Sequence, residues 1–169
     1  MTGPLLPPHV LANLKVLVVD ADKGSRRITS ELLRSLGVQT TLHAATGKEA
    51  LREIDLAQPQ VMFTERLLSE DMDGVALARW IRTDEHSASR DMPIIMITAN
   101  VTREDLFAAR EAGVTEFIVK PINVGVVASR LSAALLQPRE FVRSEDYAGP
   151  SRRRGARGSY NGQDRRGRS

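Results

Sequence analysis

The chain has 169 residues, 41% of them hydrophobic, which is enough for one domain with a buried core. It contains no cysteine, which excludes disulfides and thiolate metal sites, and no apolar run approaches the ~20 residues needed to span a bilayer. The net charge of +3 is unevenly placed, because residues 147–169 hold seven Arg and one Asp while the preceding chain is mildly acidic.

Residues 1–13 begin with a proline-rich stretch and are expected to form a flexible arm without the basic and apolar regions of a signal peptide, so a cytoplasmic location is expected. From residue 14 to residue 137, apolar runs alternate with amphipathic stretches that open on capping residues such as Asp22 and Asn123. Strands are predicted at residues 15–20, 38–44, 60–65, 93–98 and 116–120. Helices are predicted at residues 23–36, 46–57, 74–83, 102–112 and 123–136.

The strand–helix order repeats five times, which predicts an α/β fold: a doubly wound, five-stranded parallel sheet flanked by five helices. The run at residues 60–65 is short and apolar, so it is expected to be buried on both faces in the middle of the sheet. Residues 138–169 follow the last helix and become rich in Gly, Ser and Arg. Such a composition buries little apolar surface, so this extension is expected to be disordered in isolation.

Polar side chains stand at four of the predicted strand ends: Asp20, Glu65, Thr98 and Lys120. Ligands of open parallel sheets bind at the carboxyl ends of the strands, so these groups are expected to surround one pocket. Two acids, a hydroxyl and an ammonium suit an anion or a metal ion, and the lysine can pair with either carboxylate.

The segments around this pocket resemble the receiver domains of bacterial response regulators, the CheY-like family, over residues 14–136. The resemblance rests on KVLVVD at 15–20, the DGVAL turn at 73–77, IIMITA at 94–99 and the Val119-Lys120-Pro121 step. It implies a flavodoxin-like receiver fold, a phosphoryl-accepting aspartate after the third strand and two magnesium-binding acids after the first. It also implies that the threonine and lysine read the phosphoryl group, that the Lys-Pro bond is cis, and that Phe117 occupies an aromatic switch position.

The pocket departs from the family pattern at three places. Glu65 stands at the acceptor position and is one methylene longer than aspartate, Ala21 replaces the second acid, and the turn at residues 67–72 lacks the usual proline and is one residue longer. Because phosphoryl transfer depends on a well-coordinated metal, we expect no metal and little or no phosphorylation. Asp22 is interpreted as a helix cap. Glu65 either pairs with Lys120 and holds an active-like state, or belongs to a vestigial pocket without a preferred state.

The extension carries arginines and no lysine. Arginine has a planar fork that binds phosphate and guanine bidentately, and tyrosines offer stacking faces, so the tail suits a ligand with both guanines and phosphates. Cyclic di-GMP is the predicted ligand. Its predicted binding residues are Tyr147, Arg152, Arg153, Arg154, Arg157 and Tyr160.

This combination resembles the CheY-like cyclic-di-GMP effectors, the Cle proteins. The resemblance implies a non-enzymatic adaptor that binds the nucleotide and then docks on a flagellar motor switch or adhesion-related protein through its fourth helix, fifth strand and fifth helix. Two alternatives stay open: a phosphoryl-accepting response regulator with an unusual acceptor, and an RNA-associated receiver, since Arg/Gly/Ser tails also bind RNA. His9, His43 and His86 share no metal-ligand spacing and are assigned no role.

Overall fold

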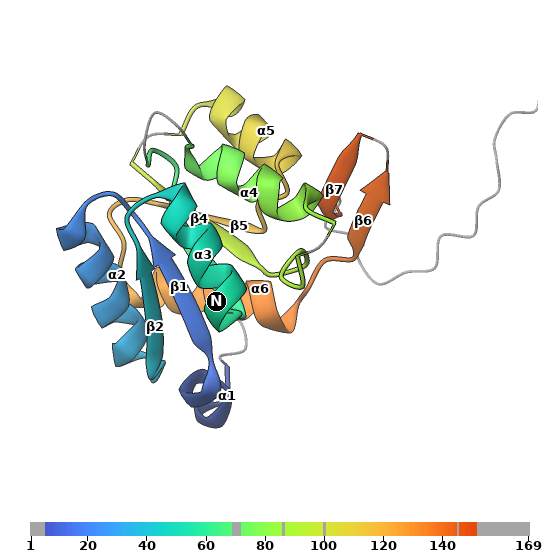
Figure 1. Ribbon diagram of the computed structural model, residues 1–169. Helices are drawn as coiled ribbons and strands as arrows, with labels where there is room; N and C mark the ends of the chain where they lie inside the picture. Colours follow the sequence, from blue (N-terminus) through green and yellow to red (C-terminus); the bar gives the residue numbers. More distant parts are fainter. Residues whose placement is uncertain (1–5, 69–71, 86, 100, 145, 152–169) are drawn as a thin grey trace, which may run out of the picture.

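The computed structural model describes residues 6–68, 72–85, 87–99, 101–144 and 146–151, and Figure 1 shows their arrangement. A five-stranded parallel sheet has the order β2-β1-β3-β4-β5, which confirms the predicted doubly wound α/β fold with β3 at its centre. Its strands are β1 (Lys15–Val19), β2 (Thr40–Ala44), β3 (Val61–Glu65), β4 (Ile94–Thr98) and β5 (Glu116–Val119).

Helices cover both faces of the sheet (Figure 1). One apolar cluster joins Val16 and Phe63 to α1, α2 and α6, and the other joins Leu17 and Met62 to α3, α4 and α5. Adjacent strand residues point to opposite faces, so the inner strands β1, β3 and β4 are buried on both sides, as their apolar runs predicted. The helices are α1 (Pro8–Asn13), α2 (Lys23–Ser35), α3 (Gly47–Ala57), α4 (Gly74–Thr83), α5 (Arg103–Glu111) and α6 (Val124–Leu136). Within the described ranges, none of them is long and apolar enough to cross a membrane.

Capping side chains begin these helices where the sequence placed them. Asp22 and Asn123 accept hydrogen bonds from the backbone N–H three residues later, at 2.7 and 2.9 Å. Thr46 and Thr102 do the same at 3.2 and 3.0 Å. Each bond satisfies a backbone donor that the first helical turn leaves unpaired, so the helix starts are fixed by local chemistry.

Two strand boundaries differ from the prediction. The second strand begins at Thr40 rather than at residue 38, because the backbone N–H of Val38 donates to the Leu33 carbonyl at 3.1 Å and completes the end of α2 instead. The fifth strand ends at Val119, and the Lys120–Pro121 peptide bond that follows is cis, as the resemblance implied.

The N-terminal segment also differs, because part of the expected flexible arm is a sixth helix. Residues 8–13 form α1, with Pro8 in its first turn, where the missing N–H of proline costs nothing. Leu6 and Leu11 are buried against α2 and α6 and provide the apolar contact that holds the helix. Three prolines indicated a loose segment, but the burial of Leu6 and Leu11 holds the helix against the receiver.

The largest correction concerns the extension, residues 138–169, which was expected to be disordered. Strands β6 (Phe141–Ser144) and β7 (Tyr147–Pro150) pair as an antiparallel hairpin, and β7 contacts α4 (Figure 1). Tyr147 is only 9% exposed, and its hydroxyl donates to the Pro150 carbonyl at 2.7 Å. Residues 152–169 lie outside the described part of the chain, so the prediction of disorder stays untested there.

The hairpin covers Arg82, a fully buried arginine near the end of α4. Its guanidinium donates to the carbonyls of Gly113 (2.9 and 3.1 Å), Arg90 (2.6 Å) and Met92 (2.8 Å). The Phe141 ring lies 5.6 Å from its central carbon. Burial lowers the pKa of Arg82 to about 10, so the side chain remains charged at neutral pH. Carbonyl dipoles and the Phe141 ring compensate the buried charge of Arg82. Because that ring belongs to the hairpin, this compensation favours packing of the hairpin on the receiver.

We expect Phe141→Ala to lower the free energy of unfolding by about 1–3 kcal/mol, because it removes packed ring surface and the cation–π contact with Arg82. The matched control is Val142→Ala, which removes an exposed neighbour on the same strand and should cost less than about 0.5 kcal/mol. Urea unfolding of both variants measures the difference. Equal losses would contradict the role of Phe141 as the cover over Arg82.

Candidate functional site

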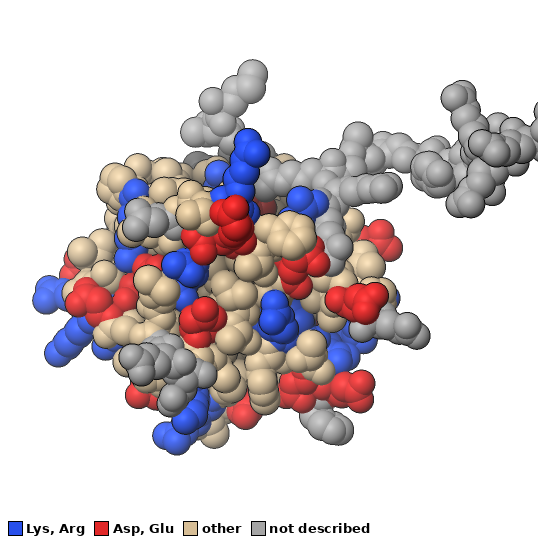
Figure 2. Space-filling model, turned by 90° about the horizontal axis from the view of Figure 1, so that it is seen from above, with Lys and Arg blue, Asp and Glu red and all other residues tan. Residues whose placement is uncertain are grey.

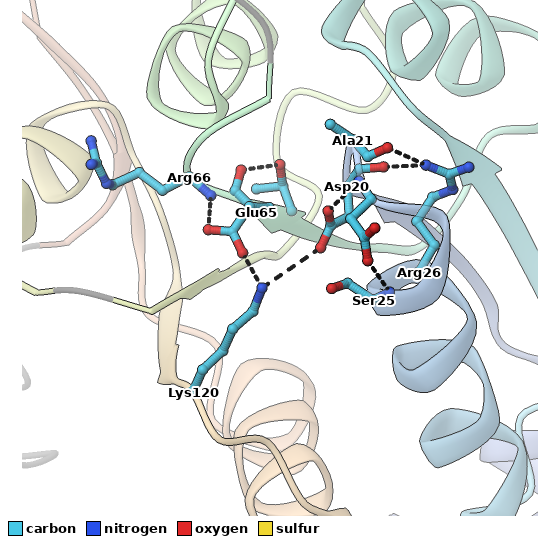
Figure 3. A network of polar contacts seen from close by, with 9 residues as sticks. Asp20, Ala21, Ser25, Arg26, Glu65, Arg66 and Lys120 are labelled. Carbon is cyan, nitrogen blue, oxygen red and sulfur yellow. Dashed lines mark hydrogen bonds and ion pairs between the residues drawn. The ribbon is translucent and has the colours of Figure 1, made fainter.

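The four predicted strand ends meet at the carboxyl edge of the sheet. Asp20 follows β1, Glu65 ends β3 and Lys120 follows β5, and Figure 3 shows the three side chains pointing toward one another. Lys120 Nζ lies 2.6 Å from Glu65 Oε2 and 3.9 Å from Asp20 Oδ2. Thr98 ends β4 beside them, and its carbonyl accepts from the Lys120 backbone N–H at 2.9 Å. The four predicted residues therefore lie together at this edge, and of the two alternatives for Glu65 the structure shows the ion pair with Lys120.

Glu65 is held in place by the backbone around it. Its Oε1 accepts from the Arg66 N–H at 2.9 Å, and its side chain is 11% exposed. Gly74 lets the chain return to this strand end, because its N–H donates to the Arg66 carbonyl at 2.8 Å and a Cβ there would collide with the Glu65 carbonyl oxygen. The Asp-Gly turn of the sequence therefore fixes the wall of the pocket.

Asp20 lies at 8% exposure beside the second carboxylate. Burial is the largest effect and raises the pKa of Asp20, and the charge of Glu65 raises it further. A hydrogen bond from the Asp22 N–H at 2.8 Å and the charge of Lys120 oppose that shift without cancelling it. The ionised form of Asp20 is therefore less favourable here than in water, and the nearer partner of the lysine is Glu65.

The donor set does not fit magnesium. Asp20 and Glu65 are the carboxylates of the pocket, Ala21 supplies none, and Asp22 caps α2, where hydrogen bonds from Ser25 lower its pKa. Magnesium requires near-octahedral oxygen ligands and accepts poor geometry reluctantly. In the part of the chain that the structure describes, no group of three or more His, Asp or Glu side chains could hold a metal ion. Residues 69–71 of the longer turn lie outside that part.

Two arginines that the sequence analysis did not single out border the pocket. Arg26 Nη1 donates to the carbonyl oxygens of Asp20 and Ala21, the latter at 3.2 Å (Figure 3). Arg66 Nη1 lies 3.3 Å from Asp105 Oδ1, so it connects the end of β3 to α5. The position of Arg66 directly after the acceptor was an available signal, whereas Arg26 comes six residues after Asp20 and contacts its backbone carbonyl.

The predicted docking face consists of α5, β5 and α6, the fourth helix, fifth strand and fifth helix of the repeat. A groove of about 410 Å³ lies there, lined in part by Leu106, Phe117 and Arg130. Phe117, the predicted switch residue, is half-buried in it. Arg139 also lines the groove, and its guanidinium donates to the Thr115 carbonyl and, at 3.3 Å, to the Ser151 carbonyl. The extension therefore forms part of this face.

The structure divides the predicted nucleotide-binding residues. Tyr147 was expected to offer a stacking face, but its ring is buried in the hairpin, where Gly149 packs closely against it and the Pro150 carbonyl accepts its hydroxyl. That assignment is corrected. The other predicted residues lie outside the described part of the chain, where the prediction stays untested: Arg152, Arg153, Arg154, Arg157 and Tyr160.

Known proteins resemble this chain in sequence. Residues 16–132 match the profile of the response regulator receiver domain. Chemotaxis protein CheY1 of Helicobacter pylori is 36% identical over 123 residues, which covers 72% of this chain and 97% of the relative. Chemotaxis protein CheY-3 of Vibrio cholerae is 35% identical over 119 residues, which covers 70% of this chain and 89% of the relative.

Solved structures resemble the fold. Vibrio cholerae chemotaxis protein CheY4 matches with a TM-score of 0.66 at 28% identity, covering 72% of this chain and 98% of that one. The receiver domain of a sensor histidine kinase from Pseudomonas aeruginosa, which has a magnesium ion in its active-site cleft, matches with a TM-score of 0.62 at 26% identity and covers 70% and 94%. Sequence profile, relatives and fold agree, and this chain belongs to the CheY-like response regulator receiver domain family.

Proposed function

We propose that this receiver is a signalling adaptor that works without phosphorylation, and the ion pair between Glu65 and Lys120 is the observation that carries the proposal. In the family, the lysine at this position reads a phosphoryl group on the strand-end acid. Here Lys120 Nζ has an anionic partner at 2.6 Å in the unmodified chain. The longer carboxylate of Glu65 takes the place of the phosphoryl group and holds an active-like arrangement.

The chemistry of the pocket supports this reading. Phosphoryl transfer relies on metal charge and positioning to stabilise the transition state. The pocket lacks the second acid, and both carboxylate oxygens of Glu65 are engaged, one by the Arg66 N–H and one by Lys120. Attack by Glu65 on a phosphodonor would require it to give up the ion pair without a metal to replace that charge.

The proposed input is cyclic di-GMP bound by the arginine-rich tail. On the folded body, positive and negative side chains are interleaved over the face that Figure 2 shows. The sequence concentrates seven arginines in its last 23 residues instead. Their planar forks suit the phosphates and guanine edges of this ligand, and ordering a tail whose composition predicts disorder would convert binding into a structural signal.

The root of that tail lies beside the proposed docking groove. The Ser151 N–H donates to the Glu140 carbonyl at 2.6 Å, and Arg139 in the groove holds the Ser151 carbonyl. The same face exposes apolar side chains, including Phe107 (66%) and Val119 (51%), that a protein partner could cover. A ligand that orders the tail therefore acts next to the groove. The proposed partner is a flagellar motor switch or adhesion-related protein, and the role is regulatory rather than enzymatic.

We expect no covalent adduct when the protein is incubated with magnesium and acetyl phosphate. Ala21 provides no carboxylate ligand for the metal, and the Glu65 carboxylate is already paired with Lys120. Intact-protein mass spectrometry measures the result. As a matched control, the double variant Ala21→Asp/Glu65→Asp restores the donor set of the family and should gain an adduct. A mass increase of one phosphoryl group on the parent chain, lost in Glu65→Gln, would establish the alternative of a phosphoryl-accepting regulator.

We expect Asp20→Asn to stabilise the fold at neutral pH by about 0.5–2 kcal/mol. The pKa of Asp20 is raised in the folded state, so folding takes up a proton as pH falls, and stability declines as pH rises through the folded pKa. Asparagine removes that penalty, so the gain should shrink toward low pH. Urea unfolding at several pH values measures it. Asp22→Asn is the control and should give no such gain, because the pKa of Asp22 is lowered.

We expect the simultaneous change of Arg152, Arg153, Arg154 and Arg157 to Ala to abolish cyclic-di-GMP binding in isothermal titration. Each charge-assisted contact contributes about 1.5–3 kcal/mol, and losing several leaves too little to order the tail. Lysine at the same four positions keeps the charge but lacks the fork, so affinity should fall at least about tenfold.

Circular dichroism confirms that both tail variants stay folded, and Glu65→Gln is the control that should bind nearly as tightly as the parent. If the lysine variant bound like the parent, the tail would be only an electrostatic patch. If RNA outcompeted cyclic di-GMP, the RNA-associated alternative would hold.

A further inference from the structure

A basic cleft lies between α2 and the edge strand β2, away from the hairpin, with α2 at the left of Figure 1 and the hairpin at the right. Its volume is about 380 Å³, within the usual range of small-molecule sites. His43 on β2 forms one side. The other side is α2, with Lys23, Arg26, Arg27, Ser30 and Arg34.

These α2 residues lie on one face of the helix. Successive spacings of three or four residues from Lys23 through Ser30 to Arg34 place their side chains above one another. At 1.5 Å per residue, the stripe is about 16 Å long. The long side chains of these cations can converge from along the stripe on a ligand that carries more than one anionic group.

The positive charges of the cleft are mostly uncompensated. Arg27 pairs with Glu31 at 2.8 Å, and this is the carboxylate that lines the cleft. Lys23 and Arg34 have no partner among the described residues. Arg26 Nη1 donates to two backbone carbonyls rather than to a carboxylate. Four cationic side chains thus face one carboxylate, which is already paired.

Ser30 and His43 give the cleft a polar floor. Ser30 is 6% exposed, its hydroxyl donates to the Arg26 carbonyl at 2.8 Å, and its oxygen lies 2.8 Å from His43 Nε2. Partial burial lowers the pKa of His43 most, and the charges of Arg26 and Arg34 lower it further. His43, to which sequence reasoning assigned no role, therefore lies where the charges of the cleft act on its ring.

We propose that this cleft binds a small phosphorylated ligand of the pyrophosphate class, with Lys23, Arg26 and Arg34 contacting its phosphate oxygens. Arginine forks bind phosphate bidentately, and lysine contributes a point charge. Asp22 at the start of α2 and Glu31 in the wall place negative charge along any longer path, which favours a compact anion over a polynucleotide. The proposed site uses none of the residues predicted to bind cyclic di-GMP, so it does not depend on that binding.

The test is a titration of the full-length protein with inorganic pyrophosphate, followed by NMR of the histidine ring C–H signals. Three histidines give three signals, and His43→Gln assigns the one from the cleft. We expect the His43 signal to shift saturably and its pKa to rise, because a bound anion offsets the charges of Arg26 and Arg34. The signals of His9 and His86 should stay in place.

Arg34→Ala should weaken the pyrophosphate affinity read at His43 by about tenfold. The matched control is Arg52→Ala, which removes an exposed arginine from α3 on the other face of the sheet and should change affinity by less than about twofold. A His43 signal that moved equally with sodium chloride at the same ionic strength would overturn the proposal, since it would show screening alone. A short oligoribonucleotide that shifted the signal at lower concentration than pyrophosphate would also overturn it.

Discussion

Lys120 is the side chain on which the carboxyl edge of the sheet depends. It brings one positive charge to a pocket that holds two largely buried carboxylates, Asp20 from the end of β1 and Glu65 from the end of β3. Without the charge of Lys120, the two largely buried carboxylates would repel each other with little solvent to screen them. The next residue, Arg66, extends the connection to Asp105 on α5, so the state of the pocket and the position of that helix share one short stretch of chain.

Arg82 has a comparable role at the end of α4. A buried guanidinium satisfied by carbonyls needs a cover that keeps water out, and the Phe141 ring of the hairpin supplies part of it. The extension is consequently packed on the receiver as far as Ser151, which places the root of the tail beside the groove of α5, β5 and α6. In the proposed adaptor, this attachment is what lets a ligand on the tail influence docking.

Local signals were enough for the fold class and for the composition of the pocket. Apolar runs, capping residues and glycine turns depend only on residues close in sequence. They therefore predicted the five strands and most helix starts without knowledge of tertiary contacts. The parallel order then forces four strand ends to one edge, which is why Asp20, Glu65, Thr98 and Lys120 could be grouped from sequence. The absence of an acid at Ala21 is likewise a property of the sequence itself.

Only the tertiary structure decided the features that depend on contacts between distant segments. The docking of the hairpin depends on Arg82 and on carbonyls of three residues that lie 8, 10 and 31 positions away, and composition alone indicated disorder there. The basic cleft required β2 to place His43 beside α2, so a lone histidine carried no signal in the sequence. The sequence determines which charged and hydrogen-bonding groups the chain carries. Their interactions require separations of a few ångströms, and for residues far apart in the chain only folding creates these.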